Sequence, residues 1–426
     1  MNIAEKIKDD IKNNKCRVAV VGIGYVGLPL VVGFAKSGIA TIAFDHNKKR
    51  IEELNNSFDR NLYYSKEDIN KVKKNIEFTT DEKKLNEADI HIIAVPTPVD
   101  KHKVPDLKPV ISAGETCGRN FKNCSIIILE STVYPGVTED ILVPIVEKES
   151  GKKYQKDFFA AYSPERVNPG DREHDIEKVV KVTSGSTKES AEAVDMLYKK
   201  VAKQTFLAKS IKVAEAAKVI ENAQRDINIA FMNELTMLFD RMGISIWDVL
   251  DAAYTKWNFL KFKPGLVGGH CIPVDPYYLI YKANEVDFYP EIIGVGRKTS
   301  DNFVYFILDK IRENLEKRDV FLKKSNILFL GITFKEDVPD ERSSLNKKLA
   351  KLMREKGANV HIVDPLVNLN EMKDGMTYDA LVFAVPHKKL KDDIGKYAKA
   401  VKKEGFIFDI KGELRGQKLG IDILTI

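Results

Sequence analysis

Cysteine is scarce in this sequence, whose 426 residues include only four. Cys16, Cys117, Cys124 and Cys271 have neither the spacing of a metal site nor the density of a disulfide framework, so we expect no bound metal and a reducing compartment, the cytoplasm. Blocks of like charge are also missing, because 68 basic and 62 acidic residues are interleaved and leave a net charge of only +6. Without a basic cluster among aromatic residues, nucleic-acid binding is not expected.

A long uninterrupted apolar run is absent as well. Residues 18–35 carry no charge, but four glycines and Pro29 interrupt them and predict a strand, a tight turn and a helix instead of a membrane span. The preceding segment lacks the apolar core and the cleavage site of a signal peptide. Ile3, Ile7 and Ile11 follow helical spacing, which is typical of an ordinary surface helix. We therefore expect no membrane association.

What remains is the pattern of a multidomain α/β protein. Strand-like and helical patterns alternate from residue 17 and again from residue 326, which predicts two doubly wound parallel sheets covered by helices. Residues 209–242 lack proline and glycine and predict one long helix, apolar on more than one face, as in a domain connector or a dimer interface. The length favours several domains, which we predict at 1–205, 206–312 (a small α-helical domain with the long helix) and 313–426.

The first strand pattern ends in a glycine-rich turn that predicts a dinucleotide site. Gly22, Gly24 and Gly27 form GxGxxG, a common pattern by itself, but here it follows a strand and opens an apolar helix. The first glycine permits the turn, the second lets a pyrophosphate approach the backbone, and the third lets the helix pack on the strand. Asp45 ends the next strand pattern, about 20 residues on, where its carboxylate would accept both ribose hydroxyls and repel the 2′-phosphate of NADP. The N-terminal domain is therefore predicted to be Rossmann-like and to bind NAD.

Alternatives stay open at this point. The glycine turn also suits another phosphate, and Asp45 also suits a cap for a helix over residues 47–55. Thr97 and Thr132 follow later strand patterns, at the edge where open α/β sheets bind ligands, and we predict them near the nicotinamide. For either threonine, the alternative is a turn hydroxyl bonded to its own backbone.

Two later segments carry candidate catalytic residues. Lys218, Asn222 and Arg225 lie at i, i+4 and i+7 of the predicted long helix and share one face. Such a row of donors suits an anionic substrate and a developing oxyanion, although a solvated polar face has the same pattern. Cys271 follows two glycines and His270 in a loop that would bring its thiol close to a ligand, whereas a lone cysteine is more often inert packing.

Over nearly its whole length the chain resembles the UDP-sugar and GDP-mannose 6-dehydrogenases. The resemblance is carried by GIGYVGLPL, VPTPVD, ESTVYPG, SPERVNPG, AKVIENAQRDINIAFMNE, GGHCIPVDPYYL and GITFKEDVPDERSS, in the family's order. It implies that domain 1–205 binds NAD, that 206–312 is a dimerisation domain carrying the cysteine loop, and that 313–426 binds the UDP-sugar. GITFK lacks a second GxGxxG, which agrees with a nucleotide site there instead of another NAD site.

The resemblance also implies a four-electron oxidation through covalent intermediates. Cys271 would attack the aldehyde made by the first hydride transfer, the second transfer would leave a thioester, and water would release the acid. Lys218 and Asn222 would stabilise the oxyanions, Glu165 would serve in hydrolysis, and Asp275 and Thr132 would position water. The implied substrate contacts are Glu165, Arg166, Val167, Lys218, Asn222, Arg225, Gly268 and Lys335. The implied cofactor contacts are Gly22, Gly24, Tyr25, Val26, Gly27, Asp45, Arg50, Thr97, Thr132 and Arg342.

TKWNFLKFKPGLVGGHC and ERVNPGDREH resemble the branch that acts on UDP-N-acetylhexosamines, above all UDP-N-acetylglucosamine. Relatives that use UDP-N-acetylmannosamine carry a His-Pro-Arg run where this chain has Thr255-Lys256-Trp257-Asn258, which places mannosamine second. A one-step dehydrogenase, which needs no cysteine, and a sensor of NAD or a nucleotide sugar are the remaining alternatives. We expect a homodimer or a higher homo-oligomer, because a helix that is apolar on several faces needs cover.

Overall fold

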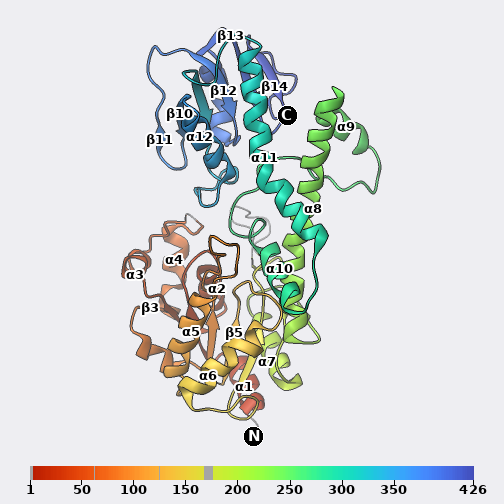
Figure 1. Ribbon diagram of the computed structural model, residues 1–426. Helices are drawn as coiled ribbons and strands as arrows, with labels where there is room; N and C mark the ends of the chain where they lie inside the picture. The colour runs from red at the N-terminus through yellow and green to blue at the C-terminus, as the bar shows by residue number, and fades with distance from the viewer. Residues whose placement is uncertain (1–2, 62, 124, 167–175) are drawn as a thin grey trace. The chain divides into compact units, whose positions relative to one another are not determined.

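The computed structural model describes residues 3–61, 63–123, 125–166 and 176–426 (Figure 1). Cys124 and the predicted substrate contact Val167 lie outside the described residues. The chain divides into two compact units, and each is described by itself. The N-terminal unit comprises Met1–Glu221 with Tyr277–Asp287, and the C-terminal unit comprises Asn222–Pro276 with Phe288–Ile426. The predicted boundaries of three domains stay predictions.

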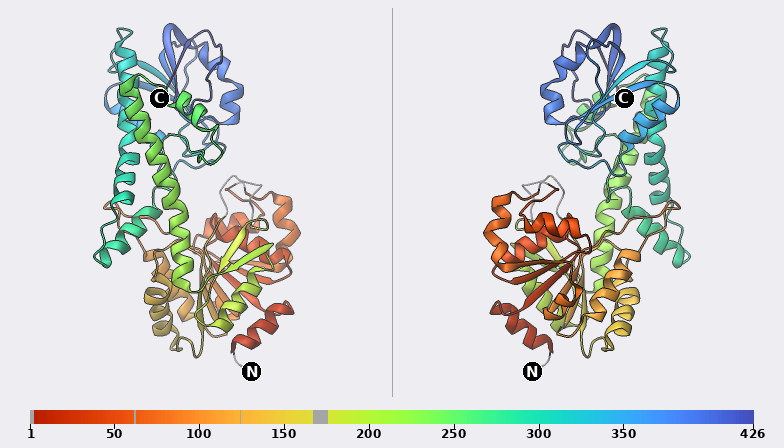
Figure 2. Two further views of the ribbon diagram at one scale, coloured as in Figure 1. Left: turned by 90° about the vertical axis from the view of Figure 1, so that its right-hand side faces the viewer. Right: turned by 90° about the vertical axis from the view of Figure 1, so that its left-hand side faces the viewer.

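The N-terminal unit contains a six-stranded parallel sheet in the order β3-β2-β1-β4-β5-β6. Its strands are β1 (Arg17–Val21), β2 (Ala40–Phe44), β3 (Ile76–Thr79), β4 (Ile90–Ile93), β5 (Ile126–Leu129) and β6 (Phe159–Tyr162). The central strands are almost continuously apolar and buried because helices cover both faces of the sheet (Figure 2). This strand order places the switch point between β1 and β4, where doubly wound folds bind nucleotides. The predicted α/β fold with a Rossmann-like first domain is confirmed.

Alternate strand residues divide between the two faces of this sheet. Val18, Ile90 and Ile126 belong to one core cluster together with buried residues of the first, second and seventh helices. The helices of the unit are α1 (Ile3–Lys12), α2 (Gly27–Lys36), α3 (Lys48–Asn55), α4 (Lys66–Val72), α5 (Lys108–Arg119), α6 (Val143–Ser150) and α7 (Lys188–Tyr198), with a π-helical turn η3 (Val137–Leu142) before α6. A second, two-stranded parallel sheet pairs β7 (Val180–Thr183) with β8 (Gln204–Leu207).

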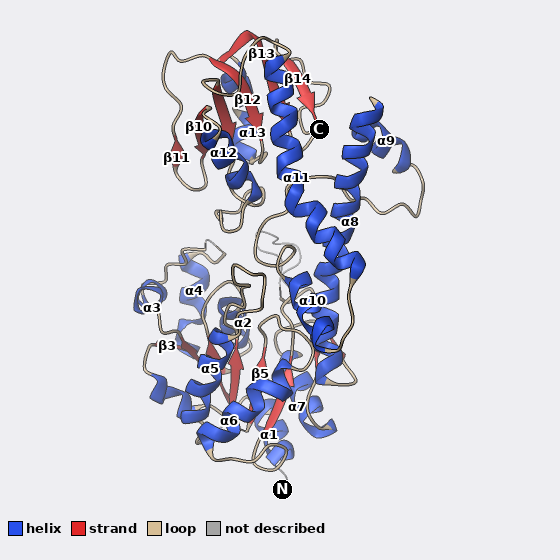
Figure 3. Cartoon of the chain, viewed as in Figure 1, coloured by secondary structure: helices blue, strands red, loops and turns tan. Residues whose placement is uncertain are grey.

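The C-terminal unit repeats the same strand order around a second sheet, β11-β10-β9-β12-β13-β14. Its strands are β9 (Asn326–Leu330), β10 (Asn359–Asp364), β11 (Leu369–Asn370), β12 (Tyr378–Phe383), β13 (Val401–Asp409) and β14 (Asp422–Thr425), of which β11 alone is antiparallel to its neighbour (Figure 3). The accompanying helices are α9 (Ile246–Ala253), α11 (Glu291–Glu316), α12 (Leu345–Glu355), α13 (Lys388–Asp392) and α14 (Ile394–Ala398). The two α/β halves are thus an architectural pair.

The predicted long helix is α8 (Ile211–Met242), which extends over 32 residues. Within the C-terminal unit it packs on α11 at Gly296, where an added Cβ would lie 3.6 Å from the Ile227 side chain. The buried Arg297 of α11 pairs with Asp226 of α8 at 2.5 Å, so a charge pair fixes the two helices at this crossing. Among the described residues, no helix combines the length and the apolarity needed to cross a membrane.

Candidate active site

The glycine turn after β1 has the geometry that a dinucleotide requires. Gly22 has φ +94°, and a Cβ there would lie 2.7 Å from the carbonyl oxygen of Ala94, beyond β4. A Cβ on Gly27 would overlap the carbonyl of Gly22, so only glycine lets α2 begin this close to the strand. Gly24 is different, because nothing lies within 4 Å of its Cβ position and its open side can receive a ligand. Tyr25 and Val26 are half-buried at the start of α2.

Asp45 follows β2 and is bonded to the glycine turn. Its carboxylate accepts the amide of Ile23 at 2.9 Å and that of Asn47 at 2.9 Å, and its side chain stays 14% exposed. The alternative of a helix cap does not apply, because the Asn47 side chain caps α3 by accepting the amide of Arg50. An ionised carboxylate has about four lone-pair positions, so Asp45 keeps capacity for ribose hydroxyls.

Arg50 is buried beneath this turn. It donates to the carbonyl of Ile23 at 2.9 Å and to Asp59 at 2.9 Å, whereas its Nη1 is buried without a hydrogen-bond partner. An unpaired buried guanidinium nitrogen indicates an acceptor supplied from outside the chain. The open side of Gly24, the remaining capacity of Asp45 and this nitrogen together fit a bound dinucleotide.

The loops after β4 and β5 carry the two predicted threonines. Thr97 and Thr132 are both half-buried, and Ser131 donates its hydroxyl to the carbonyl of Val95 at 2.7 Å, which joins the two loops. The second loop is also anchored to α8, because the buried Glu215 accepts the amides of Gly136 at 2.6 Å and Thr138 at 2.9 Å. Burial raises the pKa of Glu215 to about 7, against the lowering effect of these hydrogen bonds.

Lys218 of α8 contacts the loop after β6, which carries Glu165 and Arg166. Its ammonium donates to the Glu165 carbonyl at 2.6 Å, and its side chain is buried, so the alternative of a solvated face is wrong at this position. The carboxylate of the buried Glu165 accepts the amide of Arg166 at 2.6 Å. Arg166 itself donates to the carbonyl of Val180 at 3.0 Å and pairs with Glu221 of α8.

In the C-terminal unit, the next turn of α8 contacts the start of α10 (Asp275–Glu285). Asn222 and Asp275 are both buried, and the Asn222 amide donates to the Asp275 carboxylate at 2.5 Å. The exposed Arg225 donates to the other end of the same amide at 2.7 Å. The structure therefore brings Asn222 and Arg225 together with Asp275, which follows Asn222 by 53 positions, and it orients the Asn222 amide through both of its ends.

Cys271 lies four residues before the first residue of α10 and is exposed, unlike the buried Cys16 and Cys117. Its carbonyl accepts the amide of Asp275 at 2.8 Å, so the thiol belongs to the N-terminal end of a helix, where the macrodipole favours an anion such as a thiolate. The interpretation as inert packing is therefore wrong. The preceding Gly268 and Gly269 pass so close to Phe334 that an added Cβ at either would lie 2.9 Å from its side chain.

His270 ties the cysteine loop to the segment after β9. Its Nε2 lies 3.5 Å from Asp340, which Arg342 also contacts through two nitrogens. Although burial raises the pKa of Asp340, hydrogen bonds with His270 and Arg342 hold it well below the usual range. The sequence reasoning missed Asp340, which is separated from its partner His270 by 70 residues.

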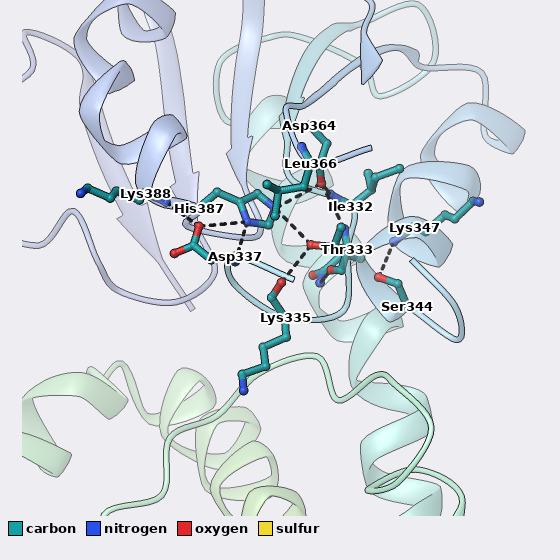
Figure 4. Close-up of polar contacts among 11 residues, drawn as sticks. Ile332, Thr333, Lys335, Asp337, Ser344, Lys347, Asp364, Leu366, His387 and Lys388 are labelled. Atoms are coloured by element: carbon teal, nitrogen blue, oxygen red, sulfur yellow. Dashed lines mark hydrogen bonds and ion pairs between the residues drawn. The ribbon is translucent and has the colours of Figure 1, made fainter. Parts of the chain in front are cut away.

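The half-buried Lys335 lies on a loop that His387 contacts through the amide of Asp337 (Figure 4). The amide of Asp337 donates to His387 Nδ1 at 2.9 Å, so Nε2 of the neutral ring carries the proton and faces Thr333 at 3.1 Å and Asp364 at 3.3 Å. Thr333 in turn donates to the carbonyl of Lys335 at 3.0 Å, and the Lys335 side chain extends away from this network (Figure 4).

Asp364 is the last residue of β10 and Asp45 directly follows β2, yet the surroundings of the two carboxylates differ. It is fully buried and accepts the amides of Ile332 at 2.8 Å and Thr333 at 3.2 Å. Burial raises the pKa of Asp364, but hydrogen bonds from His387 and Ile332 outweigh that effect and lower it. Because the oxygens of this carboxylate already accept hydrogen bonds from protein donors, they are not available to the hydroxyls of a ribose. This agrees with the absence of GxGxxG in the second half of the chain.

Comparison with known proteins agrees with this geometry. The profiles of the UDP-glucose/GDP-mannose dehydrogenase family match residues 16–202 (NAD binding domain), 212–302 (central domain) and 328–415 (UDP binding domain). Protein CapL of Staphylococcus aureus is 46% identical over 417 residues (95% of this chain, 97% of the relative), and a UDP-N-acetyl-D-glucosamine 6-dehydrogenase of Pseudomonas aeruginosa is 44% identical over 411 (93% and 96%). A solved UDP-D-ManNAc dehydrogenase of Pyrococcus horikoshii aligns with a TM-score of 0.89 and 27% identity, covering 96% of this chain and 99% of that one.

A Rossmann-type sheet with a dinucleotide turn, a long helix and a second α/β half define the class as a dinucleotide-dependent dehydrogenase. More particularly, the chain belongs to the UDP-glucose/GDP-mannose dehydrogenase family. It is an NAD-dependent oxidoreductase that acts on a nucleotide sugar. The predictions of the family, the cofactor and the type of enzyme are confirmed.

Proposed function

We propose that the protein oxidises the C6 hydroxyl of a UDP-N-acetylhexosamine, UDP-N-acetylglucosamine first of all, to the uronic acid in the cytoplasm. The relative that is 44% identical carries that substrate in its name, whereas the solved ManNAc enzyme is 27% identical. The observation that carries the proposal is the exposed Cys271 at the start of α10, one helical turn before the Asp275 that Asn222 contacts. UDP-N-acetylmannosamine is the second candidate.

The residues divide the chemistry as follows. Bound NAD would accept one hydride in each of two oxidations. After the first, the thiolate of Cys271 adds to the aldehyde carbon, and Lys218 and Asn222 donate to the oxygen that becomes negative. An ammonium has three N–H donors, of which Lys218 uses one on the Glu165 carbonyl. After the second oxidation, water attacks the thioester, the C–S bond breaks, and the thiolate and the carboxylic acid are released.

Further residues are proposed to hold the two ligands. Glu165 assists the attacking water, and Asp275 and Thr132 position it. The proposed substrate contacts are Glu165, Arg166, Val167, Lys218, Asn222, Arg225, Gly268 and Lys335. The proposed cofactor contacts are Gly22, Gly24, Tyr25, Val26, Gly27, Asp45, Arg50, Thr97, Thr132 and Arg342.

The stoichiometry of NADH tests this function most directly. With excess NAD and limiting UDP-N-acetylglucosamine, we expect two NADH per sugar, because the aldehyde remains bound until it is oxidised to the acid. The measurement is the final NADH absorbance together with mass analysis of the sugar product. One NADH per sugar would establish the one-step dehydrogenase instead. Turnover of UDP-N-acetylmannosamine or UDP-N-acetylgalactosamine in place of the glucosamine substrate would move the specificity to that sugar.

We also propose that two copies associate through α8. Phe231, Leu238 and Met242 are 52%, 50% and 58% exposed and follow a spacing of seven and four residues, which aligns them along one face of the helix. Apolar side chains exposed in a continuous row mark a surface that another protein covers. A second copy of this chain brings the same row and makes a self-complementary interface.

The paired substitution Phe231→Glu with Leu238→Glu is expected to convert the wild-type dimer to a monomer. Four glutamates would then face one another across the twofold interface, where unpaired charge is costly. Light scattering after size exclusion measures the mass. Phe321→Glu is the matched control, because Phe321 is 75% exposed and lies in the loop after α11. A monomeric wild-type protein at micromolar concentration would contradict the proposal.

A further inference from the structure

Three polar side chains are buried together behind the loop that carries Glu165. Glu130, Lys181 and Tyr198 are 1%, 0% and 0% exposed. The Lys181 ammonium lies 2.6 Å from one oxygen of the Glu130 carboxylate, and the Tyr198 hydroxyl donates to the other oxygen at 2.5 Å. The same ammonium lies 5.0 Å from the centre of the Tyr198 ring, so each member contacts both of the others.

Each member comes from a different element of the N-terminal unit. Glu130 directly follows β5 and begins the loop of Thr132. Lys181 lies in β7 and Tyr198 ends α7. The cluster therefore connects the large sheet to the small one.

The cluster holds that loop by its backbone. Lys181 donates to the carbonyl of Pro164 at 2.8 Å and approaches that of Ser163 at 3.5 Å. The carbonyl of the next residue, Glu165, accepts from Lys218. Two lysines from different elements thus fix consecutive carbonyls, and the position of the Glu165 side chain follows from the backbone that they hold.

Charge also couples the cluster to Glu165. Burial raises the pKa of Glu130 to about 7, the positive charge of Lys181 lowers it, and the negative charge of Glu165 raises it. Burial and the charge of Glu130 raise the pKa of Tyr198 well above its usual range, and Glu165 adds to this shift. The groups that face Glu130 are therefore Lys181 from β7, Tyr198 from α7 and Glu165 from the loop after β6.

A buried ion pair adds little net stability, because desolvation of the two charges offsets their attraction, and an apolar pair of similar size is often as stable. We propose that Glu130, Lys181 and Tyr198 are positioning residues that hold Glu165 in register with the Thr132 loop for hydrolysis of the thioester. This inference rests on the proposed function. It assigns the cluster to one half of the reaction: both oxidations depend on bound NAD and the second also on Cys271, whereas release of the acid depends on Glu165.

The test compares Lys181→Met, Glu130→Gln and the double variant in the full-length protein. Either single change leaves a buried charge without its counterion and can impair folding, whereas the double variant removes both charges. In the double variant we expect a first turnover of NADH formation at the wild-type rate, followed by a steady state about 100-fold slower, the order of loss for a misplaced catalytic group. Intact-mass analysis during the steady state should show the sugar acid bound to the protein as a thioester.

Hydroxylamine distinguishes a positioning role in thioester hydrolysis from a merely structural role of the cluster. It cleaves a thioester without help from Glu165, giving the hydroxamate and the thiol, so it should raise the steady-state rate of the double variant and leave that of the wild type nearly unchanged. Lys402→Met is the matched control, because Lys402 pairs with Asp379 at 2.5 Å in the C-terminal sheet. It should leave both phases unchanged.

The outcomes separate the two proposals. If the wild type makes two NADH per sugar and the folded double variant slows both phases equally or neither, the positioning role is overturned and the proposed function stands. If the wild type makes one NADH per sugar and no thioester forms in any variant, the proposed function itself fails.

Discussion

Replacement of Cys271 by alanine is expected to lower the steady-state rate of NADH formation by at least about 1000-fold. An aldehyde does not readily give up its hydrogen as hydride until a nucleophile makes its carbon tetrahedral, so the second oxidation loses the route that the Cys271 thiol would provide. The first oxidation needs no thiol, and we expect a burst of no more than one NADH per active site. Stopped-flow absorbance measures both phases. Full steady-state activity of the variant would contradict the covalent route.

Cys117→Ala is the control for this substitution. Cys117 is buried in α5, and burial raises the pKa of its thiol to about 12, so it stays protonated at neutral pH. Its removal should leave the rate unchanged and lower only the free energy of unfolding. Because Cys271 is exposed and Cys16 and Cys117 are not, iodoacetamide should label Cys271 first among these three and abolish turnover in step with labelling.

Lys218→Met is expected to lower kcat by about 100- to 1000-fold with a smaller change in KM, because it removes the donor that we propose acts on charge developing in the transition state. Both the addition to the aldehyde and the hydrolysis pass through an oxyanion, so the burst and the steady state should both slow, unlike in the Glu130/Lys181 double variant. Methionine is chosen because it keeps approximately the length of the buried lysine side chain. Steady-state and single-turnover kinetics at saturating substrate measure the two effects.

Lys212→Met provides the matched control on the same helix. Lys212 is 54% exposed and lies near Asp140, so its removal changes a surface ion pair worth at most about 1 kcal/mol. We expect wild-type kinetics from this variant. A rise in KM with unchanged kcat after Lys218→Met would show that Lys218 only binds the substrate, which would transfer oxyanion stabilisation to Asn222 alone.

Local sequence predicted the parts of the fold in which chemistry and periodicity coincide. The β1–turn–α2 segment was predicted because a buried strand, GxGxxG and an apolar helix follow one another without interruption. Helix α8 was predicted because no residue from 209 to 242 breaks a helix. The edge strand β3 was missed, since its four residues, Ile76–Thr79, include Glu77 and give no apolar run.

The site residues that the sequence predicted lie in recognisable motifs, whereas the residues that were missed contact partners far away in the sequence. Cys271, Lys218 and Asn222 stand in segments with a signature of their own. Nothing near Lys181 in the sequence indicates that its ammonium meets a carboxylate 51 positions away. In the same way, a histidine in AVPHKKL gives no sign of its contact with Asp364. A search for charged residues inside strand patterns would have found Lys181, because a lysine in a buried strand needs a partner.

By itself, the sequence determined the fold class and the cofactor, because a glycine turn and a strand-end carboxylate act through short-range geometry that the order of residues specifies. Cys271 as the nucleophile stays a prediction. Only the tertiary structure decided that Asp45 remains partly open while the corresponding Asp364 is closed, since burial by His387 and by two amides is a property of packed neighbours. The tertiary structure also decided which loops are connected by the buried ion pair of Lys181 and Glu130. A charge in a low-dielectric interior has to find its counterion wherever the folded chain brings one, at any distance along the sequence.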